Sequence, residues 1–238
     1  MDQRVDFQGC HVRQFRNEPA VEQALVQAFF GGKPGFYVDV GANDPVIDSQ
    51  SWHLEKIGWT GILVEPDPDY CKRLREQRTG RVVEKACSSP ANAGHQLRLQ
   101  RAGAHSTVEA QPIARGTATT TDAVAVECDT LDNILQAEGV RPGFDFLSVD
   151  IEGHELVALS GFSFSKWRPR LVLLEDHVVN LAKHSLMRAN GYQLLLRTGL
   201  NSWYVPVGSG FTHSLAARLE FLRKYYLGLP ARKLRFAR

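Results

Sequence analysis

The feature that most constrains this sequence is a pair of short apolar runs separated by a segment with a helical pattern. The first run, FYVDV at 36–40, is rich in β-prone residues and is followed by Gly41, where a buried strand would turn out of its sheet. Residues 49–57 read as a helix, and a second strand, Ile62–Val64, ends in Glu65 and Pro66. Two strands that flank one helix form a βαβ unit, which requires parallel strands and a right-handed crossover. We therefore expect an α/β protein.

The same alternation continues along the chain. Helices are expected over residues 18–30, 67–77 and 129–138, and after residues 150–155 through Leu159, and strands are expected over 81–87, 124–127, 144–149 and 171–174. Asp67 is the expected N-cap of its helix. Residues 191–196 and 202–207, joined by a turn with Gly199 and Asn201, predict a hairpin at the sheet edge. The expected fold is a doubly wound, mainly parallel sheet with a terminal antiparallel hairpin.

One segment, residues 88–122, fits this alternation poorly. It is rich in Ala, Gly, Ser and Thr, and it has one candidate strand at 96–100. Long irregular segments in compact domains are usually mobile or functional, so we interpret it as an insertion or a lid.

Length and composition favour one domain with appendages. The chain has 238 residues, of which 43% are hydrophobic and 23% charged, enough to bury a full core. We expect an N-terminal helical extension at 1–34, the main domain at 35–207 and a basic amphipathic segment at 208–238. The sequence has neither a long apolar run nor a signal-peptide core, so we expect neither membrane insertion nor secretion. Four cysteines without CxxC spacing (Cys10, Cys71, Cys87 and Cys128) suit reduced thiols in the cytoplasm.

Acids and histidines gather at the expected strand ends. Asp39 lies inside an apolar run, where its carboxylate needs a partner such as an amine, a hydroxyl or backbone N–H groups. Asp150 and His154 follow the strand at 144–149, and Glu175, Asp176 and His177 follow the next one. In open parallel sheets the ligand crevice lies outside these ends. Helix caps and surface histidines explain single clusters, but two clusters with Asp39 and Glu65 favour a functional site.

The turn after the first strand argues against a dinucleotide. Such a turn needs GxGxxG, but here Gly41 is followed by Ala42, Asn43, Asp44 and Pro45. The phosphate cradle is missing, while Glu65 is placed to accept hydrogen bonds from a ribose diol. An adenosine without phosphates suits this site, and S-adenosylmethionine is such a molecule, with an amine for an acid to hold.

The motifs VDVGAND, GWTGILVEPDP, DTLDNIL, DFLSVDIEGHEL and LLEDHV, in this order, resemble the FkbM-type S-adenosylmethionine-dependent methyltransferases over about residues 36–177. The resemblance implies a class I methyltransferase (Rossmann-like) fold and O-methylation of a sugar or sugar-bearing natural product. It implies cofactor contacts from Asp39, Gly41, Asn43 and Glu65. The candidate cofactor set also contains Ala42, Ser49, Pro66 and Cys87. Pro45 departs from the family pattern, because many members have glycine there and proline fixes φ and lacks an N–H.

The chemistry requires orientation and a base, since a sugar hydroxyl is a poor nucleophile until its proton is removed. The candidates for catalysis are Asp150, His154 and His177, with Glu175 and Asp176 also within the set of possible bases. Some related sugar O-methyltransferases bind a divalent metal at equivalent strand ends. That resemblance suggests Asp150, Glu175 and Asp176 as oxygen ligands, which favour Mg²⁺.

Other functions stay open at this point. A metal-dependent hydrolase would use the acids and histidines but would not explain Glu65, and a non-catalytic S-adenosylmethionine-binding module would not need the strand-end acids. Nucleic-acid binding is disfavoured because the first 211 residues carry 21 basic and 25 acidic side chains, a net charge of −4. No pattern indicates an oligomeric state.

The C-terminal segment carries the opposite charge. From Thr212 onward there are seven basic residues and one acid, a net charge of +6. Apolar residues recur there at helical spacing: Leu215, Leu219, Phe221, Leu222, Tyr225, Tyr226 and Leu229. Such a helix either lies on an anionic membrane, making the protein peripheral at the inner membrane face, or packs on the domain with its cations in water.

Overall fold

The computed structural model describes residues 19–109, 111–113, 122–211 and 215–230. Two compact units are present: residues 34–169 form the larger unit, and the segments before and after it form the smaller one. Cys10, the first 18 residues of the expected N-terminal extension and the basic stretch 231–238 lie outside the described residues. The predicted domain boundaries at 34 and 207 stay a prediction.

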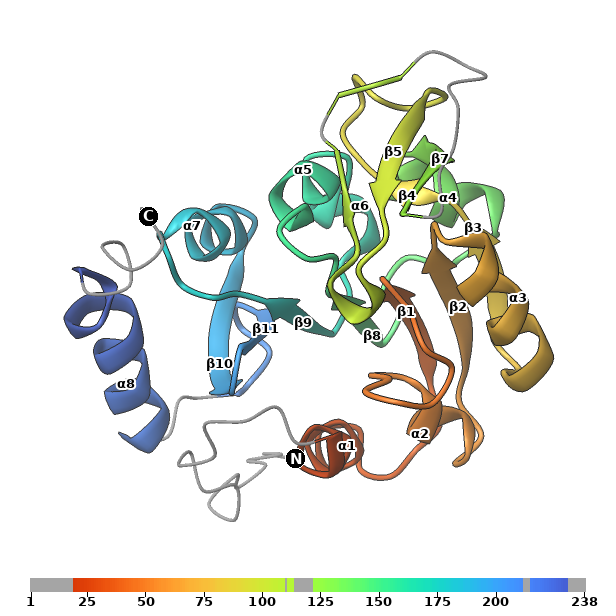
Figure 1. Cartoon of the computed structure of the whole chain (residues 1–238). Helices are drawn as coiled ribbons and strands as arrows, with labels where there is room; N and C mark the ends of the chain where they lie inside the picture. The colour runs from red at the N-terminus through yellow and green to blue at the C-terminus, as the bar shows by residue number, and fades with distance from the viewer. Residues whose placement is uncertain (1–18, 110, 114–121, 212–214, 231–238) are drawn as a thin grey trace. The chain divides into compact units, whose positions relative to one another are not determined.

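The larger unit is built on a parallel sheet (Figure 1). Its strands are β1 (Phe36–Val40), β2 (Thr60–Glu65), β3 (Arg81–Glu84) and β8 (Phe146–Val149), in the order β8-β1-β2-β3. All three pairings are parallel, with Asp39 opposite Leu63 on one side and Ser148 on the other. β1 and β8 are almost wholly buried, as expected of a parallel sheet covered on both faces. The predicted βαβ unit is confirmed.

The helix between β1 and β2 is shorter than predicted. α2 spans Trp52–Glu55, not 49–57, because residues 43–48 form a tight loop. The Asp44 carboxylate accepts hydrogen bonds from the N–H groups of Val46 and Ile47, and Asn43 and Asp48 adopt positive φ. The next helix, α3 (Pro68–Gln77), begins as predicted, since Asp67 accepts a hydrogen bond from the N–H of Asp69.

A second, four-stranded sheet lies within the larger unit. It contains β4 (Ala86–Cys87), β5 (Gln96–Gln100), β6 (Thr107–Val108) and β7 (Ala123–Asp129), in the order β4-β7-β5-β6. The predicted strand 81–87 is therefore wrong as one element: it divides at Lys85 into β3 of the first sheet and β4 of the second. The strand predicted at 96–100 is confirmed, and its alternating Leu97 and Leu99 pack against Ala86, Val126 and Cys128.

Short helices complete the larger unit. They are α4 (Leu131–Ala137), α5 (Glu155–Leu159), α6 (Phe164–Trp167) and the 3₁₀ turn η2 (Gly103–His105). Thr130 caps α4 by accepting a hydrogen bond from the N–H of Asn133. The sequence patterns did not predict α6.

The smaller unit combines an antiparallel sheet with helices. β9 (Leu171–Glu175), β11 (Asn201–Pro206) and β10 (Tyr192–Thr198) pair in the order β10-β11-β9, and both pairings are antiparallel, which confirms the hairpin. The helices are α1 (Pro19–Phe29), α7 (Ala182–Ala189), which was not predicted, and α8 (Leu215–Phe221) followed by a π-helical turn, η3 (Leu222–Leu227). The α/β class with a mainly parallel sheet and a terminal antiparallel hairpin is confirmed. None of the described helices is long and apolar enough to cross a membrane.

Candidate active site

The carboxyl ends of β1, β2 and β8 meet at one edge of the parallel sheet. The N–H of Gly41 donates to the carbonyl of Val64, and the N–H of Asp150 donates to the carbonyl of Val40. Gly41 has a φ of 87°, and a Cβ at this position would lie 1.9 Å from the carbonyl oxygen of Asp150. Only glycine fits there, because the backbone of the β8 end occupies the space that a side chain would need.

A small cavity of about 20 Å³ opens beside Gly41. Its lining comes from several segments: Val40, Gly41, Val64, Pro66, Lys85, Ala86, Cys87, Val108, Ile151 and His154. Four predicted site residues, Gly41, Pro66, Cys87 and His154, therefore lie together. A cavity of this size holds about one water molecule, so any larger ligand requires a wall to move.

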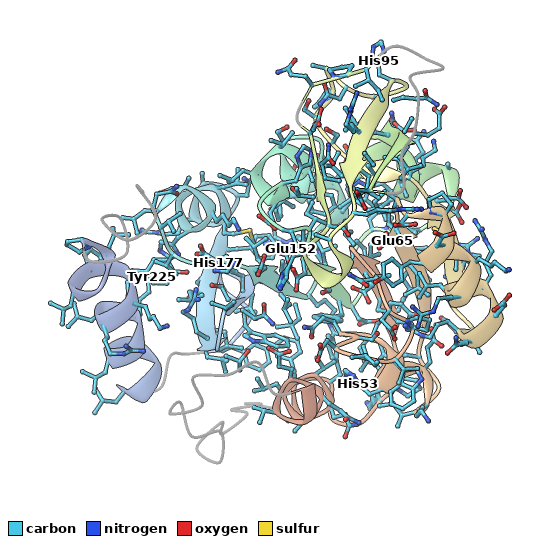
Figure 2. The ribbon with its side chains drawn as sticks, viewed as in Figure 1. His53, Glu65, His95, Glu152, His177 and Tyr225 are labelled. Carbon is cyan, nitrogen blue, oxygen red and sulfur yellow. The ribbon has the colours of Figure 1, made fainter. Side chains whose placement is uncertain are left out.

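Glu65, labelled in Figure 2, ends β2 next to this cavity. One carboxylate oxygen accepts from the N–H of Asn43 at 2.9 Å, and the other accepts from the N–H of Asp67 at 2.8 Å. Burial raises the pKa of Glu65 to about 7, although both hydrogen bonds oppose the shift. A carboxylate has about four acceptor positions, so two remain for hydroxyl donors such as those of a ribose.

Asp39 does not line the cavity. Its Oδ2 accepts a hydrogen bond from the Ser51 hydroxyl at 2.5 Å, which supplies the hydroxyl partner anticipated from the sequence. Burial raises the pKa of Asp39, while the Ser51 hydrogen bond and the charge of Arg78 lower it. Ser51 in turn accepts from Arg78 at 2.8 Å. Ser51 and Arg78 thus tie the Asp39 carboxylate to the loop that follows β1.

Arg78, just after α3, holds that loop from inside. Its guanidinium donates to the Pro45 carbonyl and to the Ser49 hydroxyl, both at 3.1 Å, and lies 3.0 Å from a Glu55 oxygen. The Arg78 side chain is fully buried. Pro45, which lacks an N–H, is therefore fixed through its carbonyl group. Ser49, a predicted cofactor residue, belongs to this network. The sequence patterns did not identify Arg78, the residue at its centre.

His154 precedes α5 and lines the cavity. Its Nε2 lies 3.1 Å from the Ser88 hydroxyl, which also accepts from the Asn92 amide at 2.9 Å. Burial lowers the pKa of His154, so the imidazole is neutral at pH 7. In its neutral form the His154 ring has one nitrogen that carries a lone pair, in the wall of the cavity at the strand ends.

The predicted insertion reaches the same cavity. Val108 of β6 lines it, and the segment is attached on two sides. Arg101 lies 2.8 Å from the buried carboxylate of Asp67, while the Thr107 hydroxyl donates to the Glu152 carbonyl at 3.2 Å. Figure 2 labels Glu152, whose carboxylate lies 3.0 Å from Nδ1 of His105. The described part of the insertion therefore contributes one wall of the cavity.

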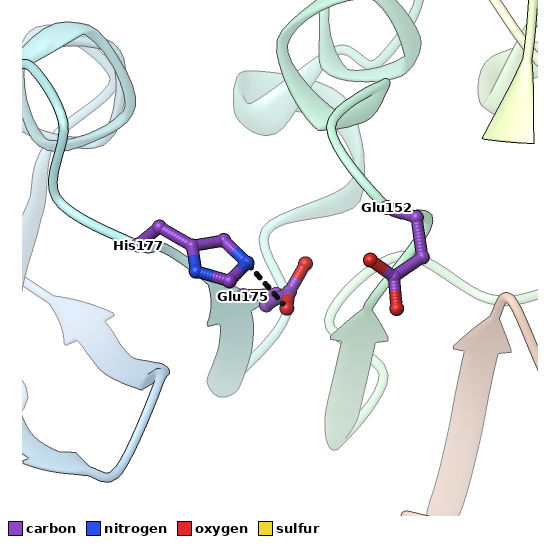
Figure 3. Close-up of side chains that lie close together, drawn as sticks. All are labelled: Glu152, Glu175 and His177. Atoms are coloured by element: carbon purple, nitrogen blue, oxygen red, sulfur yellow. Dashed lines mark ion pairs between the residues drawn. The ribbon is translucent and has the colours of Figure 1, made fainter. Parts of the chain in front are cut away.

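Three further candidates, Glu175, Asp176 and His177, lie in the smaller unit, whereas Asp150 follows β8 in the larger unit. Nε2 of His177 is 3.1 Å from Oε1 of Glu175 (Figure 3). Each carboxylate oxygen of Asp176 accepts one hydrogen bond: Oδ1 from the N–H of Val178 and Oδ2 from the Tyr225 hydroxyl. The set of Mg²⁺ ligands given by Asp150, Glu175 and Asp176 stays a prediction. The role of His177 stays a prediction.

The parallel sheet with a cavity at its carboxyl edge is the arrangement of a class I methyltransferase. The model of the methyltransferase FkbM domain family matches residues 39–194. The chain therefore belongs to the FkbM methyltransferase family, as its motifs indicated.

The solved structures to which this chain is similar include the following three proteins. Methyltransferase FkbM from Methylobacillus flagellatus KT is 15% identical, with a TM-score of 0.45 over 79% of this chain and 50% of that chain. Ribosomal protein L11 methylase from Lactobacillus delbrueckii subsp. bulgaricus is 11% identical, with a TM-score of 0.44 over 79% and 77%. WbdD, crystallised with the kinase inhibitor LY294002, is 14% identical, with a TM-score of 0.45 over 86% and 43%. This chain spans about half the length of the FkbM structure. No curated protein matches it.

Proposed function

We propose that the protein is an S-adenosylmethionine-dependent O-methyltransferase that acts on a hydroxyl group of a sugar in a glycan, glycolipid or glycosylated natural product. The observation that carries the proposal is the position of His154 in the wall of the strand-end cavity, with its Nε2 3.1 Å from the Ser88 hydroxyl. Membership of the FkbM family supports methyl transfer. The acceptor class rests on the family resemblance of the motifs.

The residues at the strand ends have the chemistry to bind an adenosine cofactor, but the cavity beside them is too small to hold it. Glu65 has acceptor positions left for ribose hydroxyls, and Gly41 lines the cavity next to it. The cavity of about 20 Å³ must widen to hold the cofactor, and Val108 of β6 is the lining residue that the insertion contributes. When bound, the cofactor would supply a methyl group attached to a sulfonium sulfur. The neutral thioether that remains after methyl transfer is a good leaving group.

His154 is the proposed general base. In the required tautomer, Nε2–H donates to the Ser88 hydroxyl, and the other ring nitrogen carries the lone pair that takes the acceptor proton. The Ser88 oxygen has two lone pairs, so it accepts from both His154 and Asn92. Ser88 is therefore a positioning residue.

The cellular setting of this proposal is the cytoplasm. The three described cysteines, Cys71, Cys87 and Cys128, are free and buried, and burial raises the pKa of each thiol. Such inert thiols suit a reducing compartment.

The test is intact-mass analysis of candidate glycans and glycolipids incubated with isotopically labelled S-adenosylmethionine. We expect one labelled methyl group on an acceptor hydroxyl. His154→Gln should lower turnover by roughly 10²- to 10⁴-fold while leaving cofactor affinity nearly unchanged. Asp150→Asn is the matched variant, because Asp150 also follows β8.

Three other outcomes would change the assignment of the base or of the function. Full activity in His154→Gln with loss in Asp150→Asn would move the base to Asp150. Cofactor binding with no labelled product from any acceptor would favour a non-catalytic binding module. Acceptor cleavage without the cofactor would favour a hydrolase.

A further inference from the structure

The helix formed by α8 and η3 has two apolar faces with different surroundings. Phe221 and Tyr225 make up the inner face and pack within the smaller unit. The Phe221 and Tyr225 rings are stacked with centroids 4.8 Å apart, and each contacts the His184 ring, at 5.1 and 5.0 Å. This face is accounted for by packing.

The hydroxyl of Tyr225, labelled in Figure 2, fixes the helix further. It donates to Oδ2 of Asp176 at 3.0 Å and lies 3.1 Å from both Arg197 and Ser202. All of these groups are buried, so the tyrosine has a polar anchor inside an apolar contact. The orientation of the helix within the smaller unit is thereby set.

The outer face presents a stripe of apolar side chains to solvent. Leu215, Leu219, Leu222 and Tyr226 follow one another three or four residues apart along α8 and η3, and all four are exposed. Their exposed fractions are 73, 58, 47 and 54%. Large apolar side chains gathered in this way mark an interaction surface, whereas singly exposed ones do not.

Cations flank the stripe. Arg218 and Arg223 are exposed and lie on either side of it at helical spacing. The sequence from Thr212 onward carries a net charge of +6, against −4 for the preceding 211 residues. The surface is thus apolar along its centre and positive at its edges.

We propose that this outer face docks on the surface of an anionic lipid bilayer, with the stripe among the acyl chains and the arginines at the headgroups. An amphipathic helix with flanking cations binds such a surface through both terms. A second copy of the chain is disfavoured as the occupant, because its identical face would bring two segments of net charge +6 together. The inference goes beyond the proposed function and does not depend on the acceptor.

The experiment is cosedimentation of the full chain with vesicles of phosphatidylcholine alone or mixed with phosphatidylglycerol, at low and high salt. Leu219→Glu combined with Leu222→Glu should weaken binding to the anionic vesicles by roughly ten-fold or more. The reason is that charged groups would replace apolar side chains that enter the bilayer on binding. Arg218→Glu and Arg223→Glu should each cost about five-fold or more, and high salt should reduce wild-type binding. Val207→Glu is the matched control, since Val207 is 60% exposed in the same unit but off the stripe.

The melting temperature of each variant shows whether a loss of vesicle binding comes from misfolding. Leu219 and Leu222 are exposed, so their variants should keep the wild-type melting temperature. Binding of anionic vesicles that requires the leucines, falls with salt and tolerates Val207→Glu supports the proposal. No vesicle binding by the full chain at low salt, equal binding by the leucine variant and the control, or self-association that the leucine variant abolishes would each overturn it.

Discussion

At the scale of single residues, one buried cation explains the shape of the loop that follows β1. Arg78 contacts Pro45, Ser49, Ser51 and Glu55 with a side chain that is fully buried. Burial alone would raise the pKa of Glu55, but hydrogen bonds from Arg78, Tyr37 and the Thr79 N–H lower it to about 2. The planar fork of arginine suits this set of acceptors, and an ammonium would not.

The first prediction therefore concerns Arg78. Arg78→Met should destabilise the fold by roughly 3–5 kcal/mol, because it leaves the Glu55 carboxylate buried without its partner. Urea unfolding measures this loss. Arg75→Met is the matched control: Arg75 is half-exposed and pairs with exposed Glu84, so its loss should cost less than about 1 kcal/mol. Equal costs for the two variants would contradict the structural role given to Arg78.

The second prediction uses the raised pKa of Glu65. Its pKa is about 7 in the fold against an ordinary value of 4.5, so the folded chain holds this proton more tightly than the unfolded chain. The stabilisation is complete below pH 4.5 and is lost as pH rises through about 7. The difference corresponds to at most about 3 kcal/mol.

Glu65→Gln removes this titration. The free energy of unfolding of the variant should fall less between pH 4.5 and pH 8 than that of the wild type, and the difference between the two proteins isolates Glu65 from other buried acids such as Asp39. Parallel stability curves for the two proteins would show that the pKa of Glu65 is not raised.

At the scale of elements, the insertion acts as a cover for the strand-end cavity. Arg101 attaches it to the N-cap of α3, and Thr107 attaches it to the turn after β8. Arg101→Ala should therefore increase amide hydrogen exchange in β5 and β6, because the attachment to the N-cap of α3 is lost. Arg98→Ala is the control, since Arg98 pairs with Glu109 of the same insertion at 3.7 Å. A larger increase in exchange for Arg98→Ala than for Arg101→Ala would contradict the covering role.

The elements that the sequence predicted well are those with a local signal. The Asp67 cap precedes α3, and alternation marks β5. The division of 81–87 has no local signal, because both halves are strand-like and only their partners differ. The helix α7 was missed since only His184 and Met187 of its eight residues are buried, which gives a weak apolar period.

At the scale of the whole molecule, the sequence proposed residues that the fold brings together without showing what they do. His154 was a candidate because strand ends converge in a parallel sheet, and it lines one cavity with the candidate cofactor residues Gly41, Pro66 and Cys87. Arg78 was not a candidate, since Arg73 and Arg75 of the adjacent helix are the same residue type and are about half-exposed. Which arginine turns inward is decided by tertiary packing, which has no signature in the residue pattern.

The central claim is that the cavity at the ends of β1 and β2 widens into the S-adenosylmethionine site, and calorimetric titration of the full chain with this cofactor at pH 8 tests it most directly. At that pH the Glu65 carboxylate is largely ionised. Glu65→Ala should weaken binding by roughly 1–3 kcal/mol through lost ribose hydrogen bonds. Glu84→Ala, at the end of the neighbouring strand β3 and half-exposed, should bind like the wild type. No binding by the wild type, or equal affinity in the wild type and Glu65→Ala, would contradict the account.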